Sequence, residues 1–242
     1  RQQINAGQML YTDMHLSHVA PMASAGFLGP LDVAVIEVVG ILPDGRLVPS
    51  TSVGNNKTWL DQARQVILEV NLQQNPALEG MHDIDSGTHW PPLGEPIALR
   101  KASDRIGTPY LPCDPSKVIA VVITEQADHH SAFDAPDEVS SRIAAHIIDF
   151  LQHEVKAARL PPNLLPLQSG VGNTANAVLA GLNQGPFDKL TAYTEVLQDG
   201  MLAMLRSGKL DFASSTALSL SPEAAAEFNA HIDFYRQRIV LR

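Results

Sequence analysis

Two short segments carry the residues whose types and spacing could do chemistry. Gly170-Val171-Gly172 follows an apolar run and precedes an alanine-rich stretch, which predicts a turn from a strand into a helix. Glycines let backbone N–H groups approach a ligand, and a helix N-terminus favours negative charge. Glu195 stands at the end of the next predicted strand, 191–196. Ligands in open α/β sheets bind beyond the carboxyl ends of the strands, so Glu195 is the candidate reactive group.

A carboxylate at this place can act as a base or as a nucleophile. The other residues of the strand suit burial, so we expect Glu195 to lose solvation and its pKa to rise. The simpler alternative is a glutamate that only faces water. Ala175 stands where the dinucleotide fingerprint has its third glycine, and because alanine is tolerated there the pattern survives weakly. The alternative for the glycine turn is a tight turn without a ligand.

Three histidine-containing segments invite a metal-site interpretation. They are His15-Leu-Ser-His18, Met81-His82-Asp83 and His129-His130. No H-E-x-x-H pattern accompanies them, and the single Cys113 has no second thiol to join it, so we expect no metal site. The lone cysteine also excludes an internal disulfide and favours a reducing compartment.

The bulk composition narrows the class of protein. The 242 residues could form one large or two ordinary domains, and 45% apolar with 18% charged residues is a globular composition. The formal net charge of −9 disfavours binding to nucleic acid or to an anionic membrane. The longest apolar runs, such as 118–123, are too short to span a bilayer.

Apolar periodicity predicts strands that alternate with helices. The strands are expected at 31–39, 66–70, 118–123, 164–168, 191–196 and 239–241, and the helices at 56–63, 136–159, 173–183, 199–207 and from Ser221. The second helix should be capped by Asp134, with Pro136 in its first turn, and should bury Val139, Ile143, Ile147, Phe150 or Leu151, and Val155. Alternating elements imply a mostly parallel sheet, and the polar segment 124–136 is the expected domain boundary.

The segments around the two candidate groups resemble a known family. Gln168-Ser-Gly-Val-Gly-Asn-Thr-Ala-Asn-Ala-Val, together with Tyr193-Thr-Glu-Val-Leu-Gln-Asp-Gly, is similar to the acetyl-CoA hydrolase/transferase family, the class I CoA-transferases that include succinyl-CoA:acetate CoA-transferases. The likeness continues through 11–18, 49–56, 69–71, 80–84, 105–110, 207–210 and 238–242, and so spans essentially the whole chain.

The resemblance implies an α/β fold with two CoA-transferase-type (NagB/RpiA-like) open sheets that carry helices on both faces. Both domains would be incomplete here, because the chain starts and stops inside apparent elements and lacks the family's later glycine-rich segment. Residues 1–130 would be the C-terminal part of the N-terminal domain. Residues 131–242 would be the N-terminal part of the C-terminal domain, which carries the catalytic glutamate.

The resemblance also implies the chemistry. Glu195 would be the nucleophile, with Gly170, Val171, Gly172 and Asn173 binding near the thioester of an acyl-CoA. The enzyme would move CoA between acetyl- or succinyl-CoA and a small carboxylate, in acetate metabolism, without a metal. The enzyme could be a homodimer, and nucleic acid and membrane partners are not expected. Its compartment would be the cytoplasm, or the mitochondrion in a eukaryote. Three alternatives stay open: acetyl-CoA hydrolysis, a non-catalytic fragment, and a site like that of sugar-phosphate isomerases.

Overall fold

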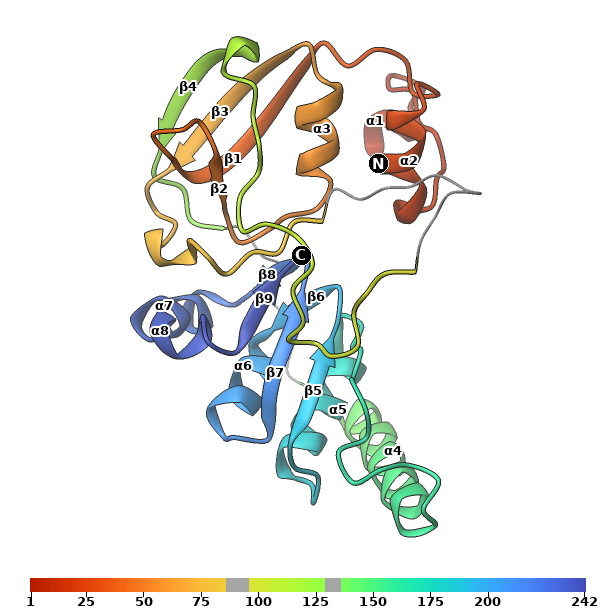
Figure 1. Cartoon of the computed structure of the whole chain (residues 1–242). Helices are drawn as coiled ribbons and strands as arrows, with labels where there is room; N and C mark the ends of the chain where they lie inside the picture. Colours follow the sequence, from red (N-terminus) through yellow and green to blue (C-terminus); the bar gives the residue numbers. More distant parts are fainter. Residues whose placement is uncertain (86–95, 129–135) are drawn as a thin grey trace.

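The computed structural model describes residues 1–85, 96–128 and 136–242. The strands form two groups, one from the first half of the chain and one from the second half (Figure 1). The C-terminal residue lies between the two groups. This arrangement decides where the candidate site lies, because both groups contribute segments to it.

The first group is a four-stranded sheet in the order β2-β1-β3-β4. Its strands are β1 (Val33–Ile41), β2 (Leu47–Pro49), β3 (Gln65–Asn71) and β4 (Val118–Thr124). β1, β3 and β4 are parallel, and β2 pairs antiparallel with β1 after a turn at Gly45. The predicted strands at 31–39, 66–70 and 118–123 are therefore confirmed. The other elements of this half are α1 (Gln2–Asn5), α2 (Leu16–Ser24), α3 (Asn56–Gln62), and the short 3-10 helices η1 (Pro76–Leu78) and η2 (Pro115–Lys117).

The second group contains a parallel sheet in the order β5-β7-β9 and a parallel pair, β6-β8. The strands are β5 (Leu190–Tyr193), β6 (Val196–Gln198), β7 (Leu210–Ser215), β8 (Ala217–Ser219) and β9 (Ile239–Leu241). The helices are α4 (Glu138–Lys156), α5 (Asn173–Gln184), α6 (Asp199–Arg206), α7 (Pro222–Ala230) and α8 (Ile232–Tyr235). Ser221 caps α7 as expected, because its hydroxyl accepts a hydrogen bond from the Ala224 N–H at 3.1 Å.

One continuous apolar core joins the two groups of strands. It includes Val38, Leu47 and Met81 from the first half and Leu197 and Leu241 from the second. Each of these side chains is at most 1% exposed. The α/β architecture that the sequence resemblance implies is thus present, with mostly parallel sheets and helices between the strands. Among the described residues, no helix is both long and apolar enough to cross a membrane.

The expected strand at 164–168 is largely absent. Only Leu167 makes a bridge, to Ala192 of β5, and Leu164 and Leu165 have φ angles of 58° and 67°. Pro166 has no N–H to give to a ladder, and positive φ is incompatible with a strand. The segment therefore follows β5 as an irregular chain that touches it at one point.

Helix α4 begins later and buries another face than the sequence pattern predicts. Asp137 caps it, with its carboxylate accepting the Ser140 N–H at 2.6 Å, whereas Asp134 lies outside the described residues and Pro136 precedes the helix. The buried residues are Ser140, Ala144 and Ile148, while Val139, Ile143 and Phe150 of the expected stripe are exposed. The reason is close packing on α5, where a Cβ on Gly181 would lie 3.0 Å from Ile148 Cγ1.

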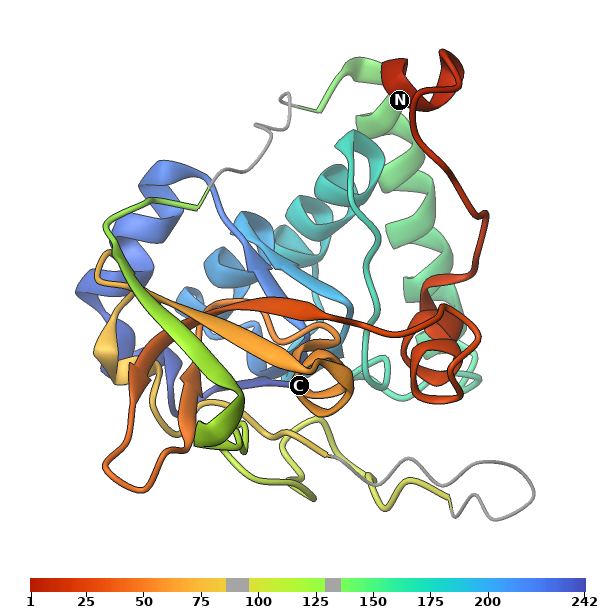
Figure 2. The same cartoon turned by 90° about the horizontal axis from the view of Figure 1, so that it is seen from above.

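One face of the first sheet is exposed. Val33 and Val35 of β1 and Val122 of β4 share this face and have 40%, 62% and 46% exposed area. In Figure 2, which views the molecule from above, β1, β3 and β4 lie in front of the second group of strands. Helices on both faces were expected, and the described part of the chain leaves this face uncovered.

Candidate active site

Glu195 lies in a break between two strands. β5 ends at Tyr193 and β6 begins at Val196, so the predicted strand 191–196 is split at Thr194 and Glu195. The Glu195 carbonyl accepts three hydrogen bonds, from the Thr216 N–H (3.0 Å), the Ser215 hydroxyl (2.8 Å) and the Thr216 hydroxyl (2.7 Å). These bonds hold the backbone of Glu195 where the chain passes from the β5-β7 pair to the β6-β8 pair.

The Glu195 side chain is exposed. The expected burial of this carboxylate is therefore wrong, because the break turns residue 195 away from the core that Thr194 and Leu197 enter. An exposed carboxylate is accessible to a substrate without any rearrangement of the described residues.

The glycine turn lies directly beside the Glu195 segment. The Leu167 N–H donates to the Thr191 carbonyl (2.7 Å) and the Tyr193 N–H donates to the Leu167 carbonyl (2.8 Å), which brings the chain along β5 to Ser169. There the Thr194 hydroxyl donates to the Ser169 carbonyl at 3.0 Å and accepts the Ser169 N–H at 3.3 Å. The Gln198 amide donates to the Gly170 carbonyl at 3.1 Å. The structure thus brings together the two segments that the sequence singled out.

The two glycines of the turn differ in what they require. Gly172, the residue before α5, has φ 117° and ψ 175°, a conformation that essentially only glycine adopts. Gly170 has no such backbone, and a Cβ built on it would meet nothing within 4 Å. Val171 between them is 61% exposed, and Asn173 begins α5, whose first N–H groups have no partner within the helix.

The difference between the glycines gives a testable prediction. Gly172→Ala should lower the free energy of unfolding by about 1–3 kcal/mol, because alanine is strained at this φ. Gly170→Ala should change it by less than about 0.5 kcal/mol, as for surface substitutions in general. Urea unfolding of both variants measures this, and equal destabilisation by the two alanines would contradict it.

A loop from the first half of the chain reaches the same place. The Val53 N–H donates to the Thr216 carbonyl, and the Leu218 N–H donates to the Thr51 carbonyl, each at 2.9 Å. Ser52 forms an antiparallel bridge with Ala217. Because Thr216 also holds the Glu195 backbone, the loop joins the candidate nucleophile to the first half, and Glu195 lies at the junction of the two groups of strands.

The segment Met81-His82-Asp83 supports this junction and is not arranged as a metal site. Asp83 accepts the Gly107 N–H (2.8 Å) and forms an ion pair with Arg242, and the Arg105 guanidinium donates to the His82 carbonyl (2.7 Å). The His82 ring is buried, and its Nε2–H donates to the Ser50 carbonyl at 2.8 Å. Burial, and secondarily the Arg105 charge, lower the pKa of His82 to about 4.

The lowered pKa of His82 predicts a pH-dependent stability. Between about pH 6.5 and pH 4 the unfolded chain binds a proton that the folded chain does not, so the folded state loses stability as the pH falls through this window. The loss should approach about 3 kcal/mol at pH 4. Urea unfolding of the parent chain and of His82→Gln across this range checks it. An equally steep dependence in His82→Gln would contradict the assignment to this histidine.

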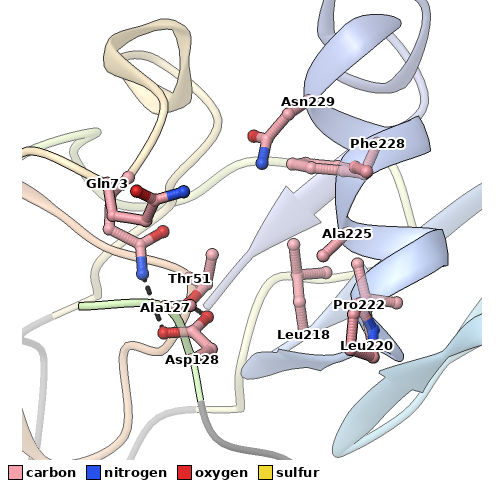
Figure 3. A pocket seen from close by; sticks show the side chains of 12 residues that line it. Thr51, Gln73, Ala127, Asp128, Leu218, Leu220, Pro222, Ala225, Phe228 and Asn229 are labelled. Carbon is pink, nitrogen blue, oxygen red and sulfur yellow. Dashed lines mark hydrogen bonds between the residues drawn. The ribbon is translucent and has the colours of Figure 1, made fainter. Parts of the chain in front are cut away.

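A cavity of about 230 Å³ also lies between the two halves (Figure 3). Polar groups on one side face an apolar wall from the second half; the lining includes Thr51, Gln74, Asp128, Leu218, Leu220 and Phe228. Asp128 accepts hydrogen bonds from Thr51 (2.7 Å) and Gln74 (2.8 Å). Glu195 does not line this cavity, so the cavity and the candidate nucleophile are separate features of the junction.

Sequence reasoning missed the residues that hold the site together. Thr194, Gln198, Ser215 and Thr216 were not predicted to have a role, although polar side chains in otherwise apolar strands are an available signal. Of the histidines considered for a metal, His15 and His18 have ring centroids 5.7 Å apart, and His129 and His130 lie outside the described residues. No cluster of three or more His, Cys, Asp or Glu suited to a metal occurs within the described part.

Curated relatives are similar to the chain over its whole length. The succinyl-CoA:acetate CoA-transferase of Clostridium kluyveri is 45% identical over 242 residues, 100% of this chain and 45% of the relative. The acetyl-CoA hydrolase of Schizosaccharomyces pombe is 42% identical, over 99% of this chain and 47% of the relative. The propanoyl-CoA:succinate CoA transferase of Escherichia coli is 39% identical, over 100% and 49%. The chain spans about half the length of the curated relatives it matches.

Solved structures share the fold. The 4-hydroxybutyrate CoA-transferase of Porphyromonas gingivalis superposes with a TM-score of 0.62 at 20% identity, covering 100% of this chain and 52% of that chain. RipA of Yersinia pestis gives a TM-score of 0.64 at 16% identity, covering 100% and 48%. At these identities the likeness establishes the architecture alone.

The family itself follows from a match between the first half of the chain and a described domain. The acetyl-CoA hydrolase/transferase N-terminal domain matches residues 1–123, which is about half of the chain. Segments 49–56, 80–84 and 238–242 of the sequence resemblance meet at the junction of the two groups of strands, where Leu241 bonds to Met81 and Asp83 and the Val53 N–H donates to Thr216. This chain belongs to the acetyl-CoA hydrolase/transferase family.

Proposed function

We propose that this chain carries the nucleophile of an enzyme that moves CoA between acetyl- or succinyl-CoA and a small carboxylate. Glu195 would form a covalent glutamyl-CoA thioester. The observation that carries the proposal is the position of Glu195: an exposed carboxylate beside a glycine turn, with its backbone held by three hydrogen bonds. The names of the relatives, which are CoA-transferases and acetyl-CoA hydrolases, support the substrate class.

The reaction would proceed by nucleophilic catalysis in two exchanges. An oxygen of the Glu195 carboxylate attacks the thioester carbonyl of acyl-CoA, the C–S bond breaks, and CoA leaves as a thiolate, so that a mixed anhydride of Glu195 and the acyl group remains. The thiolate then attacks the glutamyl carbonyl, and the first acid leaves as its carboxylate. A second carboxylate then attacks the glutamyl carbonyl of the enzyme–CoA thioester, which gives a new mixed anhydride and CoA thiolate. The thiolate attacks the acyl carbonyl of this anhydride, so that the new acyl-CoA leaves and the Glu195 carboxylate is free again.

Each attack builds negative charge on a tetrahedral oxygen, which needs donors already in place. The backbone N–H groups at Gly170, Val171, Gly172 and Asn173 are the proposed donors, because the turn lies beside Glu195 and opens α5. Loss of one such donor typically costs about 3 kcal/mol or more of transition-state stabilisation. Water must also be kept from the anhydride and the thioester, since it would hydrolyse both.

Acetyl-CoA hydrolysis is the second candidate activity. The exposure of Glu195 favours it, because water reaches this carboxylate in the described part of the chain, and the fungal relative is named as an acetyl-CoA hydrolase. Product analysis with and without acetate or succinate separates the two. A transferase forms a new acyl-CoA only with the acceptor acid, whereas a hydrolase releases free CoA without it.

The domain organisation, the partners and the compartment of the enzyme are also proposed. Residues 1–130 and 131–242 would belong to two domains of the CoA-transferase type, and acyl-CoA and small carboxylic acids would be the partners. A homodimer in the cytoplasm, or in the mitochondrion in a eukaryote, remains part of the proposal. No metal is needed by the proposed chemistry.

Mass spectrometry of the protein incubated with acetyl-CoA or succinyl-CoA tests the proposal. After proteolysis, the peptide with Glu195 should carry CoA. An adduct on another residue would overturn the assignment to Glu195. No adduct on the full product of the gene would overturn the covalent mechanism.

A further inference from the structure

Thr194 and Gln198 lie on either side of Glu195 in the sequence, and both side chains reach the glycine turn. We infer that these two residues form a clamp, the Thr194–Gln198 clamp, which positions the turn relative to the Glu195 carboxylate. They are positioning residues, because their own contacts are to the backbone of the turn. The inference rests on the proposed function, since it assigns the clamp a role in capture of CoA by Glu195.

The clamp holds two successive residues of the turn. The Thr194 hydroxyl donates to the Ser169 carbonyl (3.0 Å) and accepts the Ser169 N–H (3.3 Å), so it satisfies both backbone groups of one residue. The Gln198 amide donates to the next carbonyl, that of Gly170, at 3.1 Å. Because the turn is held at two residues, it cannot rotate about one of them without breaking the hydrogen bond at the other.

Burial fixes both clamp residues in place. Thr194 is 5% exposed and Gln198 is 3% exposed, whereas Glu195 between them faces solvent. Buried side chains have one packed position, so they transmit the position of segment 194–198 to the turn. The exposed carboxylate and the turn are thus both positioned by this segment.

Gln198 keeps one polar atom without a partner. Its Oε1 is buried and has no hydrogen-bond partner among the described residues, while its Nε2 makes the bond to Gly170. A leucine of similar volume would remove this unsatisfied atom, so core packing alone gives no reason for glutamine here. The bond to the turn is the interaction that glutamine adds.

Position matters to the proposed reaction because its donors are backbone N–H groups. A displacement of about 1 Å in an active site can reduce the rate about 100-fold. A turn released from the clamp would still bind acyl-CoA through the rest of the site, but its N–H groups would no longer meet the developing charge. The clamp should therefore act on the maximal rate of capture and leave the half-saturating acyl-CoA concentration unchanged.

The test compares variants of the full product of the gene that differ from the parent by one hydrogen bond. Thr194→Val removes the hydroxyl at constant shape, and Thr194→Ser keeps it. Gln198→Leu removes the donor to Gly170 and should shift the melting temperature by less than about 4 °C. Ser207→Ala is the control, because it loses a hydroxyl bond to Asn183 (2.6 Å) at the other end of α5.

Thr194→Val and Gln198→Leu should each lower the maximal rate of CoA capture about 10- to 100-fold, with an unchanged half-saturating concentration. Thr194→Ser and Ser207→Ala should remain within about threefold of the parent. Parent-like capture rates in Thr194→Val and Gln198→Leu would overturn the clamp while leaving Glu195 as the nucleophile.

A second readout does not depend on catalysis. Thr194→Val should accelerate hydrogen exchange of the Ser169 amide at least about 10-fold, because this N–H loses its acceptor, and Thr194→Ser should not. If the parent protein captures no CoA, the proposed function fails, and this exchange still decides the clamp. Unchanged exchange in Thr194→Val would overturn it.

Discussion

Glu195→Gln is expected to lower covalent capture of CoA by at least about 1,000-fold, because the amide has no anionic oxygen to attack a thioester. The substitution keeps the size of the side chain and leaves the three bonds to the Glu195 carbonyl intact, since those involve the backbone. Stability should therefore be unchanged. Intact-protein mass spectrometry after incubation with acetyl-CoA measures the capture.

Glu223→Gln is the matched control, because Glu223 is an exposed glutamate in the first turn of α7. It should capture CoA at the parent rate. Retained capture in Glu195→Gln would refute Glu195 as the nucleophile, and equal loss in both variants would point to a general effect of charge.

Asp83→Ala is expected to lower the free energy of unfolding by about 3–5 kcal/mol. Asp83 and Arg242 form an ion pair whose side chains are 1% and 11% exposed, and the arginine would keep its buried charge without a counter-charge. The Gly107 and Ile106 N–H groups would also lose their acceptor. Because Asp83 lies in the first half and Arg242 in the second, this loss should weaken the junction that positions Glu195. Urea unfolding measures it.

The exposed pair of Asp233 and Arg236, with side chains 90% and 40% exposed, provides the control. Asp233→Ala should change stability by less than about 1 kcal/mol, because water solvates the remaining charge. Similar losses in Asp83→Ala and Asp233→Ala would show that burial of the first pair has no energetic consequence.

Local signals predicted the elements that surround the site. The β-branched runs of β1, β3 and β4 and the serine cap of α7 were found because each depends on residues a few positions apart. The glycine turn and the glutamate were singled out for the same reason, since a turn before a helix and a polar residue at a strand end are local patterns.

Predictions that depended on distant partners were wrong. α4 buries Ser140, Ala144 and Ile148 instead of its most apolar stripe, because Gly181 of α5 allows close approach at that face. The sequence of α4 alone does not contain this information. Glu195 is exposed because the chain changes strand partners at Thr194, from Ser214 of β7 to Ala217 of β8.

The sequence by itself determined the family, the strand–helix alternation and the two segments that would do the chemistry, because these follow from short-range patterns and motif residues. Only the tertiary structure decided how the segments meet: the bonds from Thr194 and Gln198 to the glycine turn, the 50–54 loop on Thr216, and the pair of Asp83 and Arg242 across the junction. Such contacts join residues from 25 to 163 positions apart only when the whole core has formed, and local propensity carries no information about them.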